Sequence, residues 1–161
     1  MSMFPQLLRN AVILAPFIFV VHFLEEAPAF VDWFNSHVRQ GITSELFWTV
    51  NITALIITVS VTIIELSASN KLSASIIVLW FSFLMFANAL FHITGAIVDQ
   101  HYMPGLITAI VLYLPYYFFI VISMLRARKL KLAPIIILVV LGSSLMLIHG
   151  YLIIFRGSRL F

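Results

Sequence analysis

Long apolar runs follow one another along this chain, with only short polar segments between them. A helix needs about 20 apolar residues to cross a hydrocarbon layer roughly 30 Å thick. Runs at about 47–66, 73–98, 106–125 and 132–155 meet this length, and an earlier run ends at Leu24. We therefore predict an all-α fold, a single polytopic membrane domain over residues 1–161 with about five transmembrane helices.

Composition supports a chain surrounded mostly by lipid. Hydrophobic residues make up 63% of the sequence and charged residues 9%. About five crossings with short loops use the 161 residues, so no soluble domain is expected. The absence of cysteine excludes disulfides, thiolate metal ligands and a cysteine nucleophile. The net charge of +3 comes largely from a basic cluster at 126–131, which we interpret as a topology signal, so no nucleic-acid partner is expected.

Residues 29–44 mix aromatic and polar positions and predict an interfacial amphipathic helix, capped by Gly41. Such a helix would act as a membrane anchor or a lid.

The beginning of the chain has the pattern of a signal peptide with a cleavage site. This pattern consists of Arg9, the apolar run after it and the sequence at 27–29. We expect this segment to be retained as the first transmembrane helix, with Pro16 as a kink, because cleavage would discard the motif described next.

The distribution of basic residues predicts the orientation of the chain. With five crossings, the N-terminus and the basic cluster share one side of the membrane. By the positive-inside rule the N-terminus is expected in the cytoplasm and the C-terminus outside, in a plasma or inner membrane. The bases on the two sides are Arg9, Lys71, Arg126, Arg128, Lys129 and Lys131, against Arg39, Arg156 and Arg159.

A histidine and two glutamates lie at the end of the first apolar run. Glu25 and Glu26 follow His22 by three and four residues, so on a helix they fall near the imidazole. The run from Arg9 to Glu25 covers only about 24 Å as a helix, which places the acids below the far surface of a roughly 30 Å layer. Ionisable groups at membrane depth are costly unless paired or bound to a metal, and they are functional candidates by default.

Other polar residues are expected at a similar depth. Counted along their helices, the cluster at 22–26, His92 and His149 lie about 20 to 29 Å from the inner ends, in the outer half of the bilayer. Asn88 lies one turn before His92. Asn51, near the outer end of the second helix, and Tyr113 are candidates for supporting positions around one site.

Imidazole and carboxylate groups in this combination suit a divalent metal, with zinc favoured and iron or manganese as alternatives. The leading hypothesis is a metal-dependent hydrolase that acts on a lipid-like substrate entering from the outer leaflet. The predicted ligands are His22, His92, His149 and one glutamate, Glu26. The other glutamate, Glu25, would be the general base, although the sequence leaves the two acids interchangeable.

Other interpretations remain open. A glutamate could activate water without a metal while the histidines bind the oxyanion, as in an intramembrane hydrolase or protease. The protein could instead be a non-catalytic proton or cation carrier, or a haem-binding subunit in which two histidines hold the iron. A carrier of this length would need to form an oligomer. Each histidine could also be an interhelical hydrogen-bonding residue, and the glutamates a solvated helix end.

The motifs resemble the HXXEE-motif family of small multi-pass membrane proteins. The similarity rests on the residues at 22–26, Asn-Ala-Leu-Phe-His at 88–92, Tyr-x-Pro-Gly-Leu-x-Thr-Ala at 102–109, Leu114-Pro115 and His149. That family is named for its motif and is suspected of enzymatic activity without an established reaction. The resemblance thus supports a site and leaves its chemistry open.

A weaker similarity is to CAAX-type intramembrane proteases, which carry a glutamate pair and two later histidines in the order seen here. Three positions depart from that pattern. Phe30 stands where the protease motif has arginine, Asn88 where it has phenylalanine, and Ile153 where it has a polar residue. We treat this similarity as an analogy of site chemistry.

Overall fold

The structure is a computed structural model, and it describes residues 3–160. The described residues form helices and short loops, without a strand among them. In chain order the helices are α1 (Met3–Ile13), α2 (Ala15–Glu26), α3 (Phe30–His37), α4 (Ser44–Ala68), α5 (Lys71–Phe81), α6 (Asn88–Asp99), α7 (Leu106–Thr108), α8 (Leu114–Arg126) and α9 (Leu132–Arg156). Two π-helical stretches, η1 (Ser82–Ala87) and η2 (Ala109–Tyr113), lie within longer helices.

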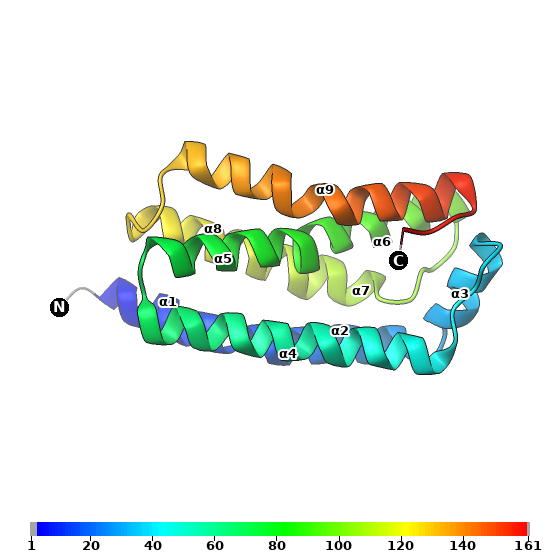
Figure 1. Ribbon diagram of the computed structural model, residues 1–161, viewed down its shortest axis with the longest axis horizontal. Helices are drawn as coiled ribbons and strands as arrows, with labels where there is room; N and C mark the ends of the chain where they lie inside the picture. Colours follow the sequence, from blue (N-terminus) through cyan, green and yellow to red (C-terminus); the bar gives the residue numbers. More distant parts are fainter. Residues whose placement is uncertain (1–2, 161) are drawn as a thin grey trace.

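The helices combine into five segments that are long and apolar enough to cross a membrane (Figure 1). The all-α fold with five membrane spans, expected from the apolar runs, is therefore confirmed, and the chain is a multi-pass membrane protein. The start of α1 and the end of α9 lie at opposite ends of the bundle. The segments are 7–26, 44–68, 71–99, 106–126 and 132–156.

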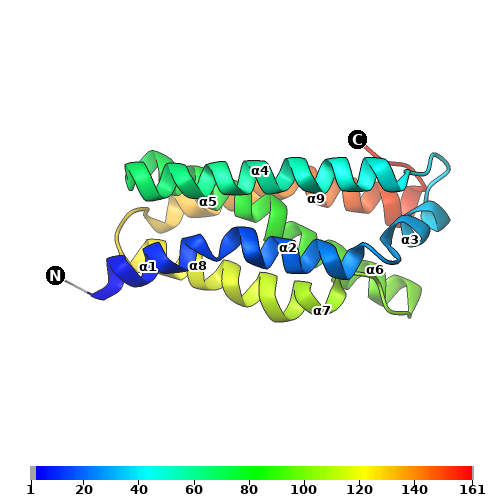
Figure 2. The ribbon, with the colours of Figure 1, turned by 90° about the horizontal axis from the view of Figure 1, so that it is seen from below.

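The third span, made of α5, η1 and α6, is the central helix of the bundle. It contacts α4, α8 and α9, and 56% of its most apolar window is buried, against 22–39% for the other spans. Gly142 permits the close approach of α9, because an added Cβ would clash with the carbonyl oxygen of Leu79. The second view shows α2 between α4 and the α7–α8 segment (Figure 2). Side chains of the third span meet those of α9, and His92 of α6 meets His22 of α2.

Two breaks in the regular helical pattern lie next to prolines. The first span is interrupted between Ile13 and Ala15, where Pro16 follows at the start of α2. In the fourth span, η2 ends at Tyr113, directly before Leu114 and Pro115. Proline lacks the amide proton of a regular helix turn, and π-helical stretches often occur at functional sites.

The interfacial helix after the first span is present as α3, but it is shorter than expected. It ends at His37 with Val38 as its C-cap, so the predicted cap at Gly41 is wrong. Gly41 instead packs under the side chain of Asn35, which exchanges two hydrogen bonds with the backbone of Ile42. A polar side chain thus organises the loop after α3, a role that the apolar pattern does not report.

The helix α3 is fastened to the end of the third span. Asp99, the last residue of α6, accepts a hydrogen bond from Nε1 of Trp33 at 2.7 Å and lies 3.0 Å from Nε2 of His37. Both partners belong to α3. These contacts hold the interfacial helix across one end of the bundle, next to the polar residues of the spans.

The opposite end of the bundle carries an ion pair between a buried glutamate and a partly exposed lysine. Glu65 of α4 contacts the ammonium group of Lys129 and accepts a hydrogen bond from the hydroxyl of Ser73 at 2.5 Å. Lys129 also donates a hydrogen bond to the hydroxyl of Ser69 at 2.9 Å. The loop between α8 and α9 is thereby attached to the end of α4.

Candidate functional site

Three buried side chains from two spans meet near the α3 end of the bundle. His22 and Glu26 lie four residues apart on α2, which places them on one face, and His92 projects from α6. The distance from Oε1 of Glu26 is 3.0 Å to Nε2 of His92 and 3.5 Å to Nε2 of His22. One ligand atom from each residue lies within 4.8 Å of the other two.

Three ring nitrogens of this cluster lack a hydrogen-bond partner and are placed where they could bind a metal. Nε2 of His22 and both nitrogens of His92 are buried without a hydrogen bond of acceptable angle, despite the short distances to Glu26. Such buried groups normally have a partner. Two ligands of a tetrahedral zinc ion lie about 3.3 Å apart, and separations of 3.5 and 3.0 Å bracket that value. The three side chains therefore fit a three-ligand metal site.

Thr108 sets the position of the proton on His22. Its Oγ1 lies 2.8 Å from Nδ1 of His22, and its hydroxyl donates to the carbonyl oxygen of Gly105 at 3.3 Å. Because the hydroxyl proton is used there, Oγ1 accepts the proton that Nδ1 carries. Nε2 then keeps a lone pair facing Glu26 and His92. Partners of this kind orient metal-binding histidines and strengthen them as ligands.

The carboxylate of Glu25 does not join the cluster. Neighbouring residues of a helix point in different directions, so Glu25 is turned from Glu26 toward the start of α7. It accepts hydrogen bonds from the amides of Ile107 at 3.0 Å and Thr108 at 2.8 Å, and from the hydroxyl of Tyr102 at 2.5 Å. A carboxylate at this place satisfies amides that have no partner within their own helix.

The hydrogen bond between Tyr102 and Glu25 persists across the physiological range. Burial, and then the hydrogen bond itself, raise the pKa of Tyr102 to about 12, so the hydroxyl remains a donor. The loop before α7 is thus tied to α2. This connection fixes the position of Thr108 relative to His22.

Gly105 lets this loop pass directly over the cluster. Its φ of +91° lies in the left-handed region that favours glycine. A Cβ added at this position would lie 2.6 Å from Cε1 of His92 and 3.0 Å from Cγ of Glu26. A larger residue here would therefore displace the groups that the cluster brings together.

A cavity of about 350 Å³ reaches the cluster, and its wall is mostly apolar. His22 and Glu26 line it, together with Asn88 and Asn51. Oδ1 of Asn88 is buried without a hydrogen bond, whereas the amide of Asn51 donates to the carbonyl oxygen of Phe47 at 3.0 Å. Both asparagines thus lie on the cavity wall, and Asn88 offers a spare acceptor there. Apolar wall residues include Phe19, Phe34, Phe47, Leu84 and Met146.

His149 lines the same cavity but is not part of the three-residue group. Its Nδ1 accepts a hydrogen bond from the amide of Leu160 at 3.2 Å. In a neutral imidazole the proton then sits on Nε2, which makes that nitrogen a donor instead of a metal ligand. The sequence could not reveal this, because the partner is a backbone amide of the segment after α9.

Tyr113 lies behind the cluster, packed on His22 with ring centroids 4.0 Å apart. Its hydroxyl is buried without a hydrogen bond. The π-helical η2 carries this residue. The structure thus brings a buried phenol next to the predicted metal ligands.

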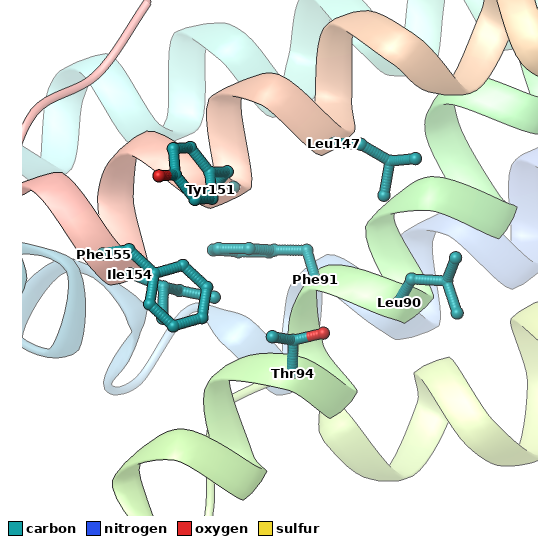
Figure 3. A pocket seen from close by; sticks show the side chains of 8 residues that line it. Leu90, Phe91, Thr94, Leu147, Tyr151, Ile154 and Phe155 are labelled. Carbon is teal, nitrogen blue, oxygen red and sulfur yellow. The ribbon is translucent and has the colours of Figure 1, made fainter.

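A second cavity, of about 100 Å³, lies between α6 and α9 (Figure 3). The labelled side chains are mostly apolar, and none is an acid, a base or a histidine. Phe91 lines both this cavity and the larger one. We therefore place the candidate site in the larger cavity, where the ionisable groups converge.

Residue spacing predicts no role for Tyr102, Gly105 and Thr108, although all three belong to the motif at 102–109. Their importance comes from loop geometry, which residue spacing along single helices does not report. The signal was the concentration of tyrosine, proline, glycine and threonine in a short loop facing the end of the first span.

Comparison with known proteins supports the motif. A family described as proteins of unknown function with an HXXEE motif matches residues 13–120. The matched region contains all three residues of the cluster and ends before His149. The curated proteins and the solved structures gave no match. Because the match covers most of the chain, this protein belongs to the HXXEE-motif family.

Proposed function

We propose that the protein is a membrane-embedded, metal-dependent hydrolase. The observation that carries this proposal is the buried group of His22, Glu26 and His92, whose ligand atoms lie within 4.8 Å of one another while the histidine Nε2 atoms have no hydrogen bond of acceptable angle. A catalytic zinc site commonly has three protein ligands and one open position. Zinc is the favoured ion, and iron or manganese would suit the same donors.

The residues of the chain have distinct roles in this proposal. His22, Glu26 and His92 hold the ion, and Thr108 orients His22. Bound zinc lowers the pKa of a coordinated water to about 7, which supplies a nucleophile for hydrolysis. Glu25 takes a positioning role in place of the general base, because its oxygens bind the start of α7.

The substrate is proposed to be lipid-like. The cavity volume of about 350 Å³ falls in the range of small-molecule sites, and its wall is mostly apolar. By the positive-inside rule the basic end of the bundle faces the cytoplasm, so the cavity lies toward the outer leaflet. Asn88 would accept a hydrogen bond from the substrate through its unpartnered Oδ1.

A haem-binding role fits the cluster less well. The rings of His22 and His92 have centroids 5.0 Å apart and an interplanar angle of 83°. Glu26 lies within 3.5 Å of Nε2 in both rings. A carboxylate therefore occupies the space that a porphyrin between two axial histidines would need.

Metal content of the detergent-purified protein tests the proposal. We expect close to one equivalent of zinc in the wild type and a loss of most of it in His92→Ala. His101→Ala is a matched control, because His101 is an exposed loop residue outside the cluster. His149→Ala is expected to retain the metal, since its Nδ1 accepts a hydrogen bond from the backbone.

Two results would contradict the proposal. A wild-type protein without stoichiometric metal would favour the metal-free alternative, in which a glutamate activates water. Equal metal content in wild type and His92→Ala, with both proteins folded and monodisperse, would place the metal elsewhere.

A further inference from the structure

The cavity that reaches the cluster carries one cationic side chain, Arg159, on an otherwise mostly apolar wall. Arg159 is half-buried and makes no ion pair with an acid among residues 3–160. His149 lines the same cavity. A guanidinium group at a cavity, with no acidic partner in the described part of the chain, is suited to bind a carboxylate or phosphate through two parallel hydrogen bonds.

Several hydrogen bonds hold the segment of Arg159 in place. The amide of Ser158 donates a hydrogen bond to the carbonyl oxygen of Leu152 at 3.1 Å. The carbonyl oxygen of Gly157 accepts a hydrogen bond from the amide of Arg39 at 3.2 Å. On the other side of Arg159, the amide of Leu160 donates to Nδ1 of His149 at 3.2 Å. The chain is therefore turned back after α9, so that Arg159 lines the cavity instead of pointing away from the bundle.

We infer that Arg159 binds the anionic group of a single-chain amphiphile whose hydrocarbon chain occupies the cavity. This inference rests on the proposed function and names the substrate class of that site. Arg159 follows the end of α9 and so lies at the end of the bundle, whereas Leu84 and Ala54 line the cavity from within the spans. A charged head at the membrane surface and an apolar chain below it match the way an amphiphile lies in a leaflet.

His149 acts as a positioning residue in this arrangement. It accepts the hydrogen bond that fixes Leu160, the residue after Arg159. The histidine predicted to bind metal would thus set the place of the guanidinium group. Its replacement is expected to weaken binding of anionic amphiphiles while leaving metal content unchanged.

Native mass spectrometry of the full chain in neutral detergent tests the inference. The probes are 1-oleoylglycerol 3-phosphate, oleate and the uncharged 1-oleoylglycerol, which share one acyl chain. We expect the wild type to bind the two anions more tightly than 1-oleoylglycerol. Arg159→Gln is expected to weaken binding of the two anions by roughly tenfold or more and to leave binding of 1-oleoylglycerol unchanged. A stronger effect on the phosphate or on oleate identifies which anionic group the site takes.

Matched variants make the test specific. Arg156→Gln removes an exposed arginine that packs on Tyr151 outside the cavity, and it should keep the preference for anions. Arg159→Lys should keep part of it, because the charge remains. The inference would be overturned if the wild type bound charged and uncharged probes equally. It would also be overturned if Arg159→Gln and Arg156→Gln lost the same amount of anion binding.

The lipid-binding test of Arg159 can be interpreted separately from the metal-content test of the cluster. Arg159→Gln is expected to keep its zinc, and Glu26→Gln is expected to keep the preference for anionic probes. A wild type that lacks metal but shows the Arg159-dependent preference would overturn the metal-dependent mechanism alone. A wild type that holds metal but shows no preference would overturn the assignment of Arg159 alone.

Discussion

Glu25 and Glu26 are adjacent in sequence, yet their carboxylates are held by different parts of the fold. Oε1 of Glu26 lies 3.0 Å from Nε2 of His92, whereas Oε2 of Glu25 accepts a hydrogen bond from the amide of Thr108 at 2.8 Å. One acid faces the ligand cluster and the other fixes the helix that supports it. The two glutamates of the motif therefore have separable effects.

Exchanging each glutamate for glutamine should separate binding from stability. Glu26→Gln removes an anionic ligand, so we expect zinc affinity to fall at least about tenfold. Glu25→Gln weakens the hydrogen bonds to Tyr102 and the start of α7, so we expect a loss of about 1–3 kcal/mol in unfolding free energy. Metal content and thermal unfolding, measured on both variants, check these results. The same loss of zinc in both would contradict the division.

Thr108 should control how strongly His22 binds metal. Thr108→Val removes the oxygen that accepts the proton on Nδ1, and we expect zinc affinity to fall about 10- to 100-fold. Thr108→Ser keeps the hydroxyl and should retain most of the affinity. Titration against a chelator of known affinity measures both. An unchanged affinity in Thr108→Val would remove Thr108 from the site.

Gly105→Ala should disrupt the cluster through direct contact. The new Cβ would lie 2.6 Å from Cε1 of His92, so we expect loss of most bound zinc together with a lower unfolding temperature. Gly157→Ala is a matched control, since Gly157 also has a positive φ but, among the residues that the structure describes, its Cβ would meet only the backbone oxygen of His37 at 3.3 Å. Both variants carry a backbone cost of about 1–2 kcal/mol. Only Gly105→Ala should lose metal, and equal metal content in the two would speak against the close packing.

The ion pair at the far end of the bundle should matter for stability alone. Lys129→Met leaves the carboxylate of Glu65, which is 3% exposed, without its counter-charge. We expect a destabilisation of about 3–5 kcal/mol. The double variant Glu65→Leu with Lys129→Met removes both charges and should recover most of it. Thermal unfolding in detergent measures this, and zinc content should stay constant in both proteins.

The membrane spans were predictable because a helix that crosses lipid must be apolar over its whole length. The second span was expected at about 47–66 and is found at Ser44–Ala68, and the last was expected at about 132–155 and is found at Leu132–Arg156. The loop after α3 was less predictable. There the side chain of Asn35 decides the path of the backbone, so the helix ends at His37 and not at Gly41.

Residue spacing along the helices predicted the candidate site only in part. His22 and Glu26 share a face because they are four residues apart on one helix. Their approach to His92 follows from the tertiary arrangement of α2 and α6 in the bundle. His149 lies at a similar level, but its Nδ1 is bound to the backbone of Leu160. A depth estimate gives the height of a side chain in the bundle and leaves its direction around the helix axis undetermined.

The sequence by itself determined the membrane class, the spans and the chemical character of the motif at 22–26, because these depend on local composition and helical periodicity. Only the tertiary structure decided that Glu26 turns to His92, that Glu25 binds the start of α7 and that Arg159 reaches the cavity. These contacts join residues far apart in the chain. Their geometry depends on how helices rotate and pack against one another, which no single segment encodes.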